Sequence, residues 1–166
     1  MQIIIGKLNP TLTQGLLSGL EGYFHTEEDS EQVPISLESH KKLLALHPSS
    51  LATSFSDDGN LVASVVTIPT TKEITDLFMS GEITEKELFD RTEPRGNSEA
   101  LYLMSAFVAP DYRRRGLGIQ LTKELISKID SDAKLTLFAW PTSEEGKKFT
   151  NALQENIHRA ILVRVR

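Results

Sequence analysis

Hydrophobic and polar positions along the chain change their period several times, and each change marks a new element. Residues 2–8 form a short β-branched run that ends at Asn9-Pro10, which predicts a strand followed by a turn. Residues 11–24 carry apolar side chains at every fourth position, and residues 34–46 repeat a helical pattern. The first third of the chain is therefore expected to form one strand and two helices.

A strand-like pattern replaces the helical one at residue 51. Residues 51–56 and 61–68 flank the run Asp-Asp-Gly-Asn, which is typical of a hairpin turn. Residues 71–99 then interrupt the sheet pattern with polar helix formers. From residue 73 to residue 99 there are eight carboxylates and three cations, so this span alone carries the charge of −5 of the whole chain. We expect a lid, a binding loop or a plain solvated insertion at about 71–99, within a single domain of residues 1–166.

The second half of the chain has the clearest pattern of predicted strands and helices. Residues 101–108 are almost continuously apolar, as expected for a strand covered on both faces. Residues 116–130 have an apolar arc on one side of a helix. A strand at 135–140, a helix at 143–153 and a last strand at 160–165 follow. The sum predicts an α/β fold with a central sheet and helices on both faces.

Composition excludes several classes of protein. The 166 residues are 39% hydrophobic and 25% charged, as in an ordinary globular domain. Eighteen basic and 23 acidic residues give a net charge of −5, which argues against binding to nucleic acid or to an anionic membrane. The sequence has no cysteine, its four histidines lack metal spacing, and no metal is expected. Without a signal-like or bilayer-length apolar run, we expect a cytoplasmic protein.

The segment between the apolar strand and the amphipathic helix has the features of a pyrophosphate site. The first turn of a helix leaves backbone N–H groups unpaired at its electropositive end. Gly116 and Gly118 would let an anion approach the main chain, and the arginines at 113–115 supply donors that suit phosphate oxygens. The spacing fits neither a P-loop, which needs Gly-Lys-Ser/Thr, nor the Gly-x-Gly-x-x-Gly of dinucleotide sites.

This segment resembles the signature of the GCN5-related N-acetyltransferase (GNAT) family, Arg/Gln-x-x-Gly-x-Gly/Ala. Residues 113–118 match it, preceded by Val108, Pro110 and Tyr112, and the order of elements also agrees. The resemblance implies a GNAT-like mixed sheet, acetyl-CoA as the acyl donor, and direct attack by a primary amine in a ternary complex. The acidic segment favours a small cationic molecule or a peptide as acceptor. Family members are often dimers, so a homodimer is an open expectation.

The resemblance also implies roles for single residues. Backbone amides of the arginine-glycine loop would hold the pyrophosphate, and the strand edge at 106–108 would pair with pantetheine where the strand separates from residues 138–140. The amide of Val108 would polarise the thioester carbonyl. Tyr102 takes the place of a glutamate base, and Ser143 takes the place of an asparagine that contacts the cofactor. The expected cofactor-binding residues are Ala106, Phe107, Val108, Arg113, Arg114, Arg115, Gly116, Leu117, Gly118, Ile119 and Ser143.

The sequence departs from the family after the next strand. The family commonly shows Asn-x-x-Ala-x-x-Phe-Tyr, in which the tyrosine is the general acid. This chain has Thr150 at the tyrosine position and only Phe149 in agreement. A threonine hydroxyl is a far poorer acid than a phenol, and no base is evident. The alternative is therefore a non-catalytic coenzyme A-binding module with a regulatory or interaction role.

Overall fold

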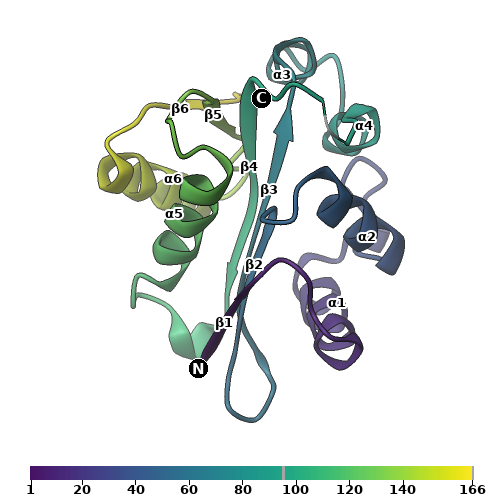
Figure 1. Cartoon of the computed structure of the whole chain (residues 1–166), viewed down its shortest axis with the longest axis vertical. Helices are drawn as coiled ribbons and strands as arrows, with labels where there is room; N and C mark the ends of the chain where they lie inside the picture. The colour runs from purple at the N-terminus through teal and green to yellow at the C-terminus, as the bar shows by residue number, and fades with distance from the viewer. Residues whose placement is uncertain (95, 166) are drawn as a thin grey trace.

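One mixed sheet of six strands runs through the centre of the protein. The computed structural model describes residues 1–94 and 96–165 (Figure 1). The strands lie in the sheet in their chain order; the first four are antiparallel, and β4–β5 and β5–β6 are parallel. They are β1 (Gln2–Ile5), β2 (Leu51–Phe55), β3 (Leu61–Thr70), β4 (Ala100–Val108), β5 (Thr136–Ala139) and β6 (Ile161–Val163).

Helices cover both faces of the sheet, as the sequence predicts (Figure 1). Four helices share one apolar cluster with β2–β5, and two helices pack in separate clusters on the other face. The two sets are α1 (Pro10–Phe24), α2 (Leu37–Leu46), α3 (Lys72–Met79) and α4 (Glu85–Arg91), then α5 (Leu117–Ile129) and α6 (Glu144–Ile157), with short 3₁₀ turns η1 (Thr26–Glu28) and η2 (Pro110–Tyr112). Within the described ranges, no helix is both long and apolar enough to cross a membrane.

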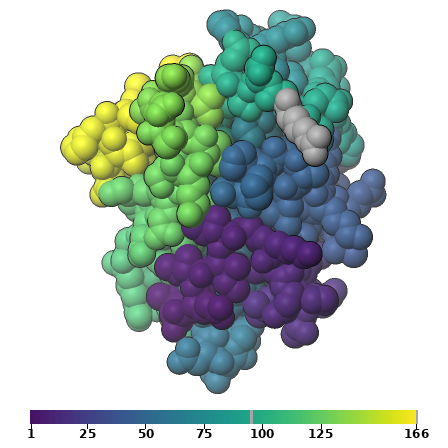
Figure 2. Space-filling view, in the orientation of Figure 1, coloured from purple at the N-terminus to yellow at the C-terminus, as the bar shows by residue number. Residues whose placement is uncertain are grey.

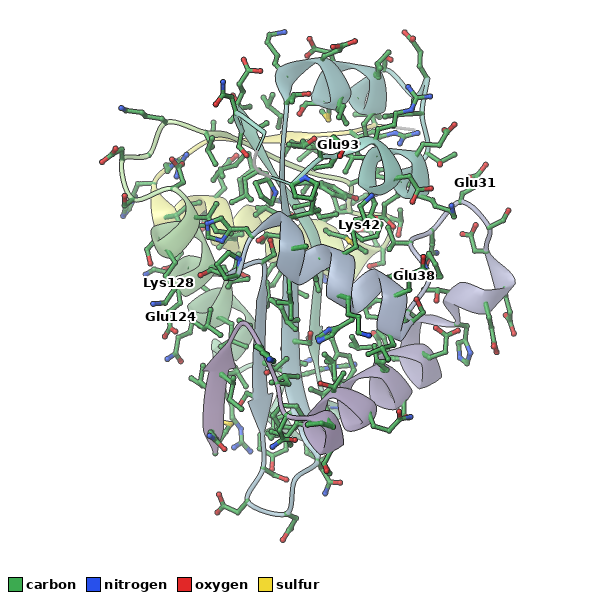
Figure 3. All side chains as sticks on the ribbon, turned by 45° about the vertical axis from the view of Figure 1, so that its right-hand side comes forward. Glu31, Glu38, Lys42, Glu93, Glu124 and Lys128 are labelled. Carbon is green, nitrogen blue, oxygen red and sulfur yellow. The ribbon has the colours of Figure 1, made fainter. Side chains whose placement is uncertain are left out.

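The segment at 71–99 is not the open loop that its charge suggests. It folds into α3 and α4, whose apolar residues Phe78, Leu88 and Phe89 are buried in the core. A capping box at Thr84 fixes the start of α4. Lys42 of α2, labelled in Figure 3, donates to the backbone oxygen of Phe89 at 2.6 Å and holds the other end of α4. The insertion is thus part of the packed body of the protein.

A bulge in β4 changes the side to which its residues point. Leu103 pairs with Thr67 and Ser105 pairs with Val66, so Met104 is an extra residue. Tyr102 and Phe107 are an odd number of residues apart and nevertheless join the same apolar cluster. A strict two-residue alternation would place them on opposite faces, and the extra residue at the bulge brings them to the same one.

Several element ends differ from the sequence expectation. The first, fifth and sixth strands are shorter than the runs at 2–8, 135–140 and 160–165. The second helix starts at Leu37 because the Ser36 hydroxyl accepts from the Ser39 amide at 3.1 Å and caps it there. The helix α6 continues beyond residue 153 to Ile157.

Candidate functional site

The edge of β4 that faces β5 is paired along only half of its length. Leu103 pairs with Ala139 and is the last β4 residue in this parallel ladder, whereas β4 runs on to Val108. Residues 104–108 therefore leave a free edge of about 16 Å. The separation expected near 138–140 exists, but it opens beyond Ala139 because Phe138 is still paired.

Two residues of the free edge present backbone groups to the separation. The amide of Ala109 donates to the oxygen of Val62 on the β3 side, at 2.8 Å. Because successive residues of a strand point their backbone groups to opposite sides, Phe107 pairs toward β3, and Ala106 and Val108 face the separation. Of the three edge residues expected to meet a cofactor, Phe107 instead contributes a buried ring to the core.

The free edge leads into a turn that exposes backbone amides. Arg114 has a φ of 63° and Gly116 a φ of 72°, both in the left-handed region. Gly116 is the N-cap of α5, and no side chain caps its first turn. Backbone N–H groups in such alternating conformations form an anion-binding concavity, which the positive end of α5 reinforces. These are the backbone features that a pyrophosphate site at 113–119 requires, and the site itself stays a prediction.

Two of the three arginines stabilise this turn through hydrogen bonds to backbone oxygens. The Arg113 Nε donates to the Val108 oxygen at 2.9 Å, and the Arg115 Nη2 donates to the Asp111 oxygen at 3.1 Å. Arg114, between them, is exposed. The side chains of Arg113 and Arg115 are thus engaged with backbone oxygens, while the backbone amides of the turn remain the groups predicted to bind an anion.

The two signature glycines have different physical roles. A Cβ at Gly116 would meet nothing within 4 Å, so the space beside it is open, and its positive φ favours glycine. A Cβ at Gly118 would lie 3.0 Å from Cε2 of Phe149 and 3.4 Å from Cγ2 of Val108. Gly118 thus lets α5 pack against α6 and β4. The expectation that it clears space for an anion is wrong, because Phe149 fills that space.

The start of α6 carries the other departures from the family signature. The Ser143 hydroxyl is exposed and accepts from the Gly146 amide at 3.0 Å, which caps α6. The Thr150 hydroxyl is buried and donates to the Gly146 oxygen at 2.9 Å. Thr150 therefore supplies no free proton donor at the position of the family tyrosine.

A hollow of about 390 Å³ lies beside the pyrophosphate turn, between α5 and α6. Figure 2 shows the C-terminal segment (yellow) packed beside the green segment that carries α5 and β5. Glu124 lines the hollow and lies on the outward face of α5 in Figure 3. The lining residues are Gly116, Ile119, Gln120, Lys123, Glu124 and Asn156.

On the opposite face of the sheet, Tyr102 is paired with a carboxylate. The Tyr102 hydroxyl donates to Glu85 Oε1 at 2.7 Å, and the tyrosine ring stacks on Phe138 with 5.0 Å between centroids. Tyr102 is 1% exposed, so its hydroxyl meets a ligand only through Glu85, which is half-buried. Sequence reasoning missed Glu85, because nothing in the sequence distinguishes it among eight carboxylates.

Burial shifts the pKa of both partners of this pair. It raises the pKa of the Glu85 carboxyl, and the hydrogen bonds from Tyr102 and the Val33 backbone oppose that rise. Asp29 raises the same pKa further and Arg164 lowers it. The pKa of Tyr102 is raised well above its ordinary value by burial and then by the neighbouring carboxylate. Tyr102 therefore stays protonated and donates, while Glu85 is the partner that titrates.

An arginine from the C-terminal tail closes the same region. The Arg164 guanidinium lies 4.2 Å from the ring centroid of Trp140 and 4.4 Å from that of Phe78. Its backbone amide donates to the Ala139 oxygen at 2.9 Å, where the ladder between β4 and β5 ends. The tail thus joins β5 to α3 at the point where the strands separate.

An apolar cavity of about 70 Å³ lies on this face, between α1, α2 and the sheet. Met104 at the bulge forms part of its wall, as do Val33 and Phe89. His40 lines it too, and burial lowers the pKa of this histidine, which favours the neutral imidazole. His40 lies three residues before Leu43 on α2, so the two side chains are on the same side of the helix. Sequence reasoning did not use this spacing.

Two other expectations concern histidines and metals. His47, one of the four histidines, accepts from the Ser49 amide through Nδ1 at 3.0 Å and ends α2. Among residues 1–94 and 96–165, no three His, Asp or Glu side chains gather as a metal site would require.

No protein-family model matches the sequence, and no curated protein sequence matches it significantly. Solved structures do match. A Drosophila melanogaster polyamine N-acetyltransferase is 18% identical, with a TM-score of 0.56 over 92% of this chain and 82% of the other. The aminoglycoside 6'-N-acetyltransferase AAC(6')-Ih from Acinetobacter baumannii is 13% identical, with a TM-score of 0.56 over 99% of this chain and 95% of the other.

A third solved structure has the same fold. Chaetomium thermophilum Naa20, solved with a bisubstrate analogue, is 15% identical, with a TM-score of 0.53 over 92% of this chain and 70% of the other. At such identities the comparison concerns the fold. The fold is that of the GNAT acetyltransferases, which confirms the resemblance found in the sequence.

Proposed function

We propose that this protein is an N-acyltransferase that moves an acetyl group from acetyl-CoA to a primary amine. The observation that carries the proposal is the free edge of β4, which leads through η2 and the arginine turn into the first turn of α5, where no side chain caps the helix. An extended ligand with amide groups and a pyrophosphate matches both parts: amides pair with a strand edge, and the diphosphate binds the turn.

The free edge also gives a direction to the bound donor. Val108 lies at the turn end of the edge, and Leu103, where β5 rejoins β4, lies at the other end. With the pyrophosphate at the turn, the backbone of Val108 and Ala106 would pair with pantetheine, and the thioester would lie toward Met104. Val108 is thus better placed for pantetheine than for the thioester carbonyl, the role first expected of it.

The chain's own residues then supply binding and orientation. Acetyl-CoA brings an activated acyl carbon, and the turn amides and strand edge hold it in one direction. The donor would lie along the free edge of β4, and the amine would arrive from the α1–α4 face, where the apolar cavity lies. Holding the two substrates in line supplies much of the rate in reactions of this kind.

Thiol release tests this function. Purified protein is incubated with acetyl-CoA and each member of a panel of small amines, polyamines, aminoglycosides and peptides, and free coenzyme A is measured. We expect release that depends on at least one amine. Binding of acetyl-CoA by calorimetry without release for any acceptor would overturn the proposal.

The second candidate is a non-catalytic coenzyme A-binding module. The buried Thr150 hydroxyl, bonded to the Gly146 oxygen, favours it because the usual proton donor is missing. Such a module would bind acetyl-CoA with no acceptor dependence. The same two measurements, binding and thiol release, separate the two functions.

A further inference from the structure

The apolar cavity and the Glu85–Tyr102 pair lie on the same α1–α4 face and share neighbouring residues, although neither Glu85 nor Tyr102 lines the cavity. Val33 lines the cavity, and its backbone hydrogen-bonds to the Glu85 carboxylate. Phe89, another lining residue, is one helical turn from Glu85 on α4, so both side chains occupy one face of that helix. Tyr102 and Met104 both pack in the apolar cluster of this face. The segment that carries Val33, helix α4 and strand β4 thus connect the cavity with the Glu85 carboxylate.

We propose that the cavity and Glu85 form one acceptor subsite, which takes a primary amine carried on a compact apolar body and in which Glu85 accepts the ammonium proton. This inference rests on the proposed function. It assigns the proton acceptor to α4, outside the signature strand and helix.

The shape and chemistry of the cavity set the class of acceptor. Its volume of about 70 Å³ exceeds the roughly 10–15 Å³ that one water needs by the same measure. Most of its wall is aliphatic or aromatic, from Leu16, Leu20, Leu43 and Val66 among others. Such a wall stabilises an apolar body and leaves a polar chain unsolvated. A polyamine would therefore bind less well than an amine with a short aliphatic or aromatic group.

The proton transfer is balanced within the reaction. The ammonium gives one proton to the Glu85 carboxylate, and the free amine nitrogen attacks the thioester carbon. The C–N bond forms, the C–S bond breaks, and the coenzyme A thiolate leaves with the electron pair. The second proton of the nitrogen goes to the thiolate, and Glu85 returns its own proton to solvent.

The surroundings of Glu85 suit a proton acceptor. Tyr102 from β4 donates to one carboxylate oxygen and fixes the side chain, so Tyr102 is a positioning residue. Asp29 from the loop after η1 and Arg164 from the C-terminal tail are the charged groups that act on the carboxyl, with opposite signs. The raised pKa of Glu85 makes it a stronger base than an exposed glutamate, while it stays partly accessible.

The test compares Glu85→Gln with Glu82→Gln, an exposed carboxylate of the same segment. We expect Glu85→Gln to lower kcat about 100-fold, the lower range for loss of an acid–base group, and to remove the acidic limb of the kcat–pH profile. The affinity for acetyl-CoA by calorimetry should stay unchanged. Glu82→Gln should behave as the wild type.

A graded set of amines tests the cavity. With propylamine, isoamylamine, benzylamine and spermidine, kcat/KM should be highest for the apolar amines, and Leu17→Phe should reduce it most for the largest of them. Leu17 is a half-buried lining residue, so the larger ring narrows the cavity. A preference for spermidine, unaffected by Leu17→Phe, would overturn the assigned class.

The outcomes separate the two proposals. Wild-type protein that releases no thiol with any amine contradicts the proposed function, and with it this inference. An active wild type whose Glu85→Gln variant keeps its kcat and pH profile contradicts this inference alone. Loss of the acidic limb of the kcat–pH profile in His40→Gln, with that limb kept in Glu85→Gln, would also contradict this inference alone. Circular dichroism and thermal unfolding of each variant establish that it is folded.

Discussion

Single residues in this protein combine local packing with site geometry, and Gly116 and Gly118 show how different two signature positions are. The first has a left-handed conformation and open space, and the second has an aromatic ring against it. The sequence motif treats them alike. The positive φ of Gly116 and the contact of Gly118 with Phe149 distinguish them, and that contact comes from a helix residue 31 positions further along the chain.

The two glycines therefore respond differently to alanine. Gly116→Ala should cost about 1 kcal/mol through its φ of 72° and weaken acetyl-CoA binding by distorting the turn amides. Gly118→Ala should cost about 1–2 kcal/mol through overpacking against Phe149. Urea unfolding and calorimetry measure the two effects. Equal losses of affinity in the two variants would contradict this assignment.

Glu85 links stability to pH. Its pKa is raised above the ordinary value of 4.5 by burial, so the folded state binds the proton more tightly than the unfolded state. The stabilisation from the protonated form is present below about pH 4.5 and is lost as the pH rises through the raised folded value. Glu85→Gln should therefore raise Tm relative to the wild type, by a margin that grows from pH 4.5 toward neutrality.

Thermal unfolding across that pH range measures the margin. A gain in stability together with a loss of kcat would be the pattern of a residue kept for activity. If the Tm difference between Glu85→Gln and the wild type is constant or negative, the Glu85 carboxylate stabilises the folded state, against the expected sign.

At the scale of elements, the sequence predicts the order and type of strands and helices, and misses what depends on distant partners. The bulge at Met104 is invisible to a two-residue period, and the burial of α3 and α4 is hidden by their charge. The turn between β4 and α5 was predictable because strand, turn and helix are contiguous, and its role as a pyrophosphate site stays a prediction. The Glu85–Tyr102 pair was not predictable, because it joins side chains of two different elements, 17 residues apart.

The far end of α5 is fixed by a buried carboxylate. Asp130 accepts from the amides of Lys134 and Leu135 at 2.8 and 3.1 Å, and from Arg159 at 2.8 Å. Asp130→Ala should destabilise the protein by about 2–4 kcal/mol, because it leaves a half-buried guanidinium and two amides without this acceptor.

Urea unfolding measures that loss. The affinity for acetyl-CoA should change little, since Asp130 lies at the opposite end of α5 from the turn. Asp132→Ala is the matched control, because Asp132 and its partner Lys134 are both exposed. A control as destabilised as Asp130→Ala would contradict the assignment.

At the scale of the whole molecule, the proposed donor and acceptor sites lie on opposite faces of the sheet. The α5 turn lies on one side, and the apolar cavity and Glu85 lie on the other. Between them, β4 and β5 part beyond Leu103 and Ala139, which leaves an opening in the backbone pairing of the sheet. An elongated donor that binds along this opening contacts elements from both faces and should stabilise the fold as a unit.

Acetyl-CoA should therefore raise Tm. At a ligand concentration 100 times Kd, the expected stabilisation is about 2.7 kcal/mol. Differential scanning fluorimetry against a series of acetyl-CoA concentrations measures it, with free acetate as the control. An unchanged Tm at millimolar acetyl-CoA would contradict donor binding.

Trp140 gives this protein a built-in optical probe. It is the single tryptophan of the chain, and its indole lies against the Arg164 guanidinium where β4 and β5 part. Its emission therefore reports on one place in the molecule, the point where β4 and β5 separate. Ligand binding on either side can be followed by the wavelength and intensity of tryptophan fluorescence, without an attached label.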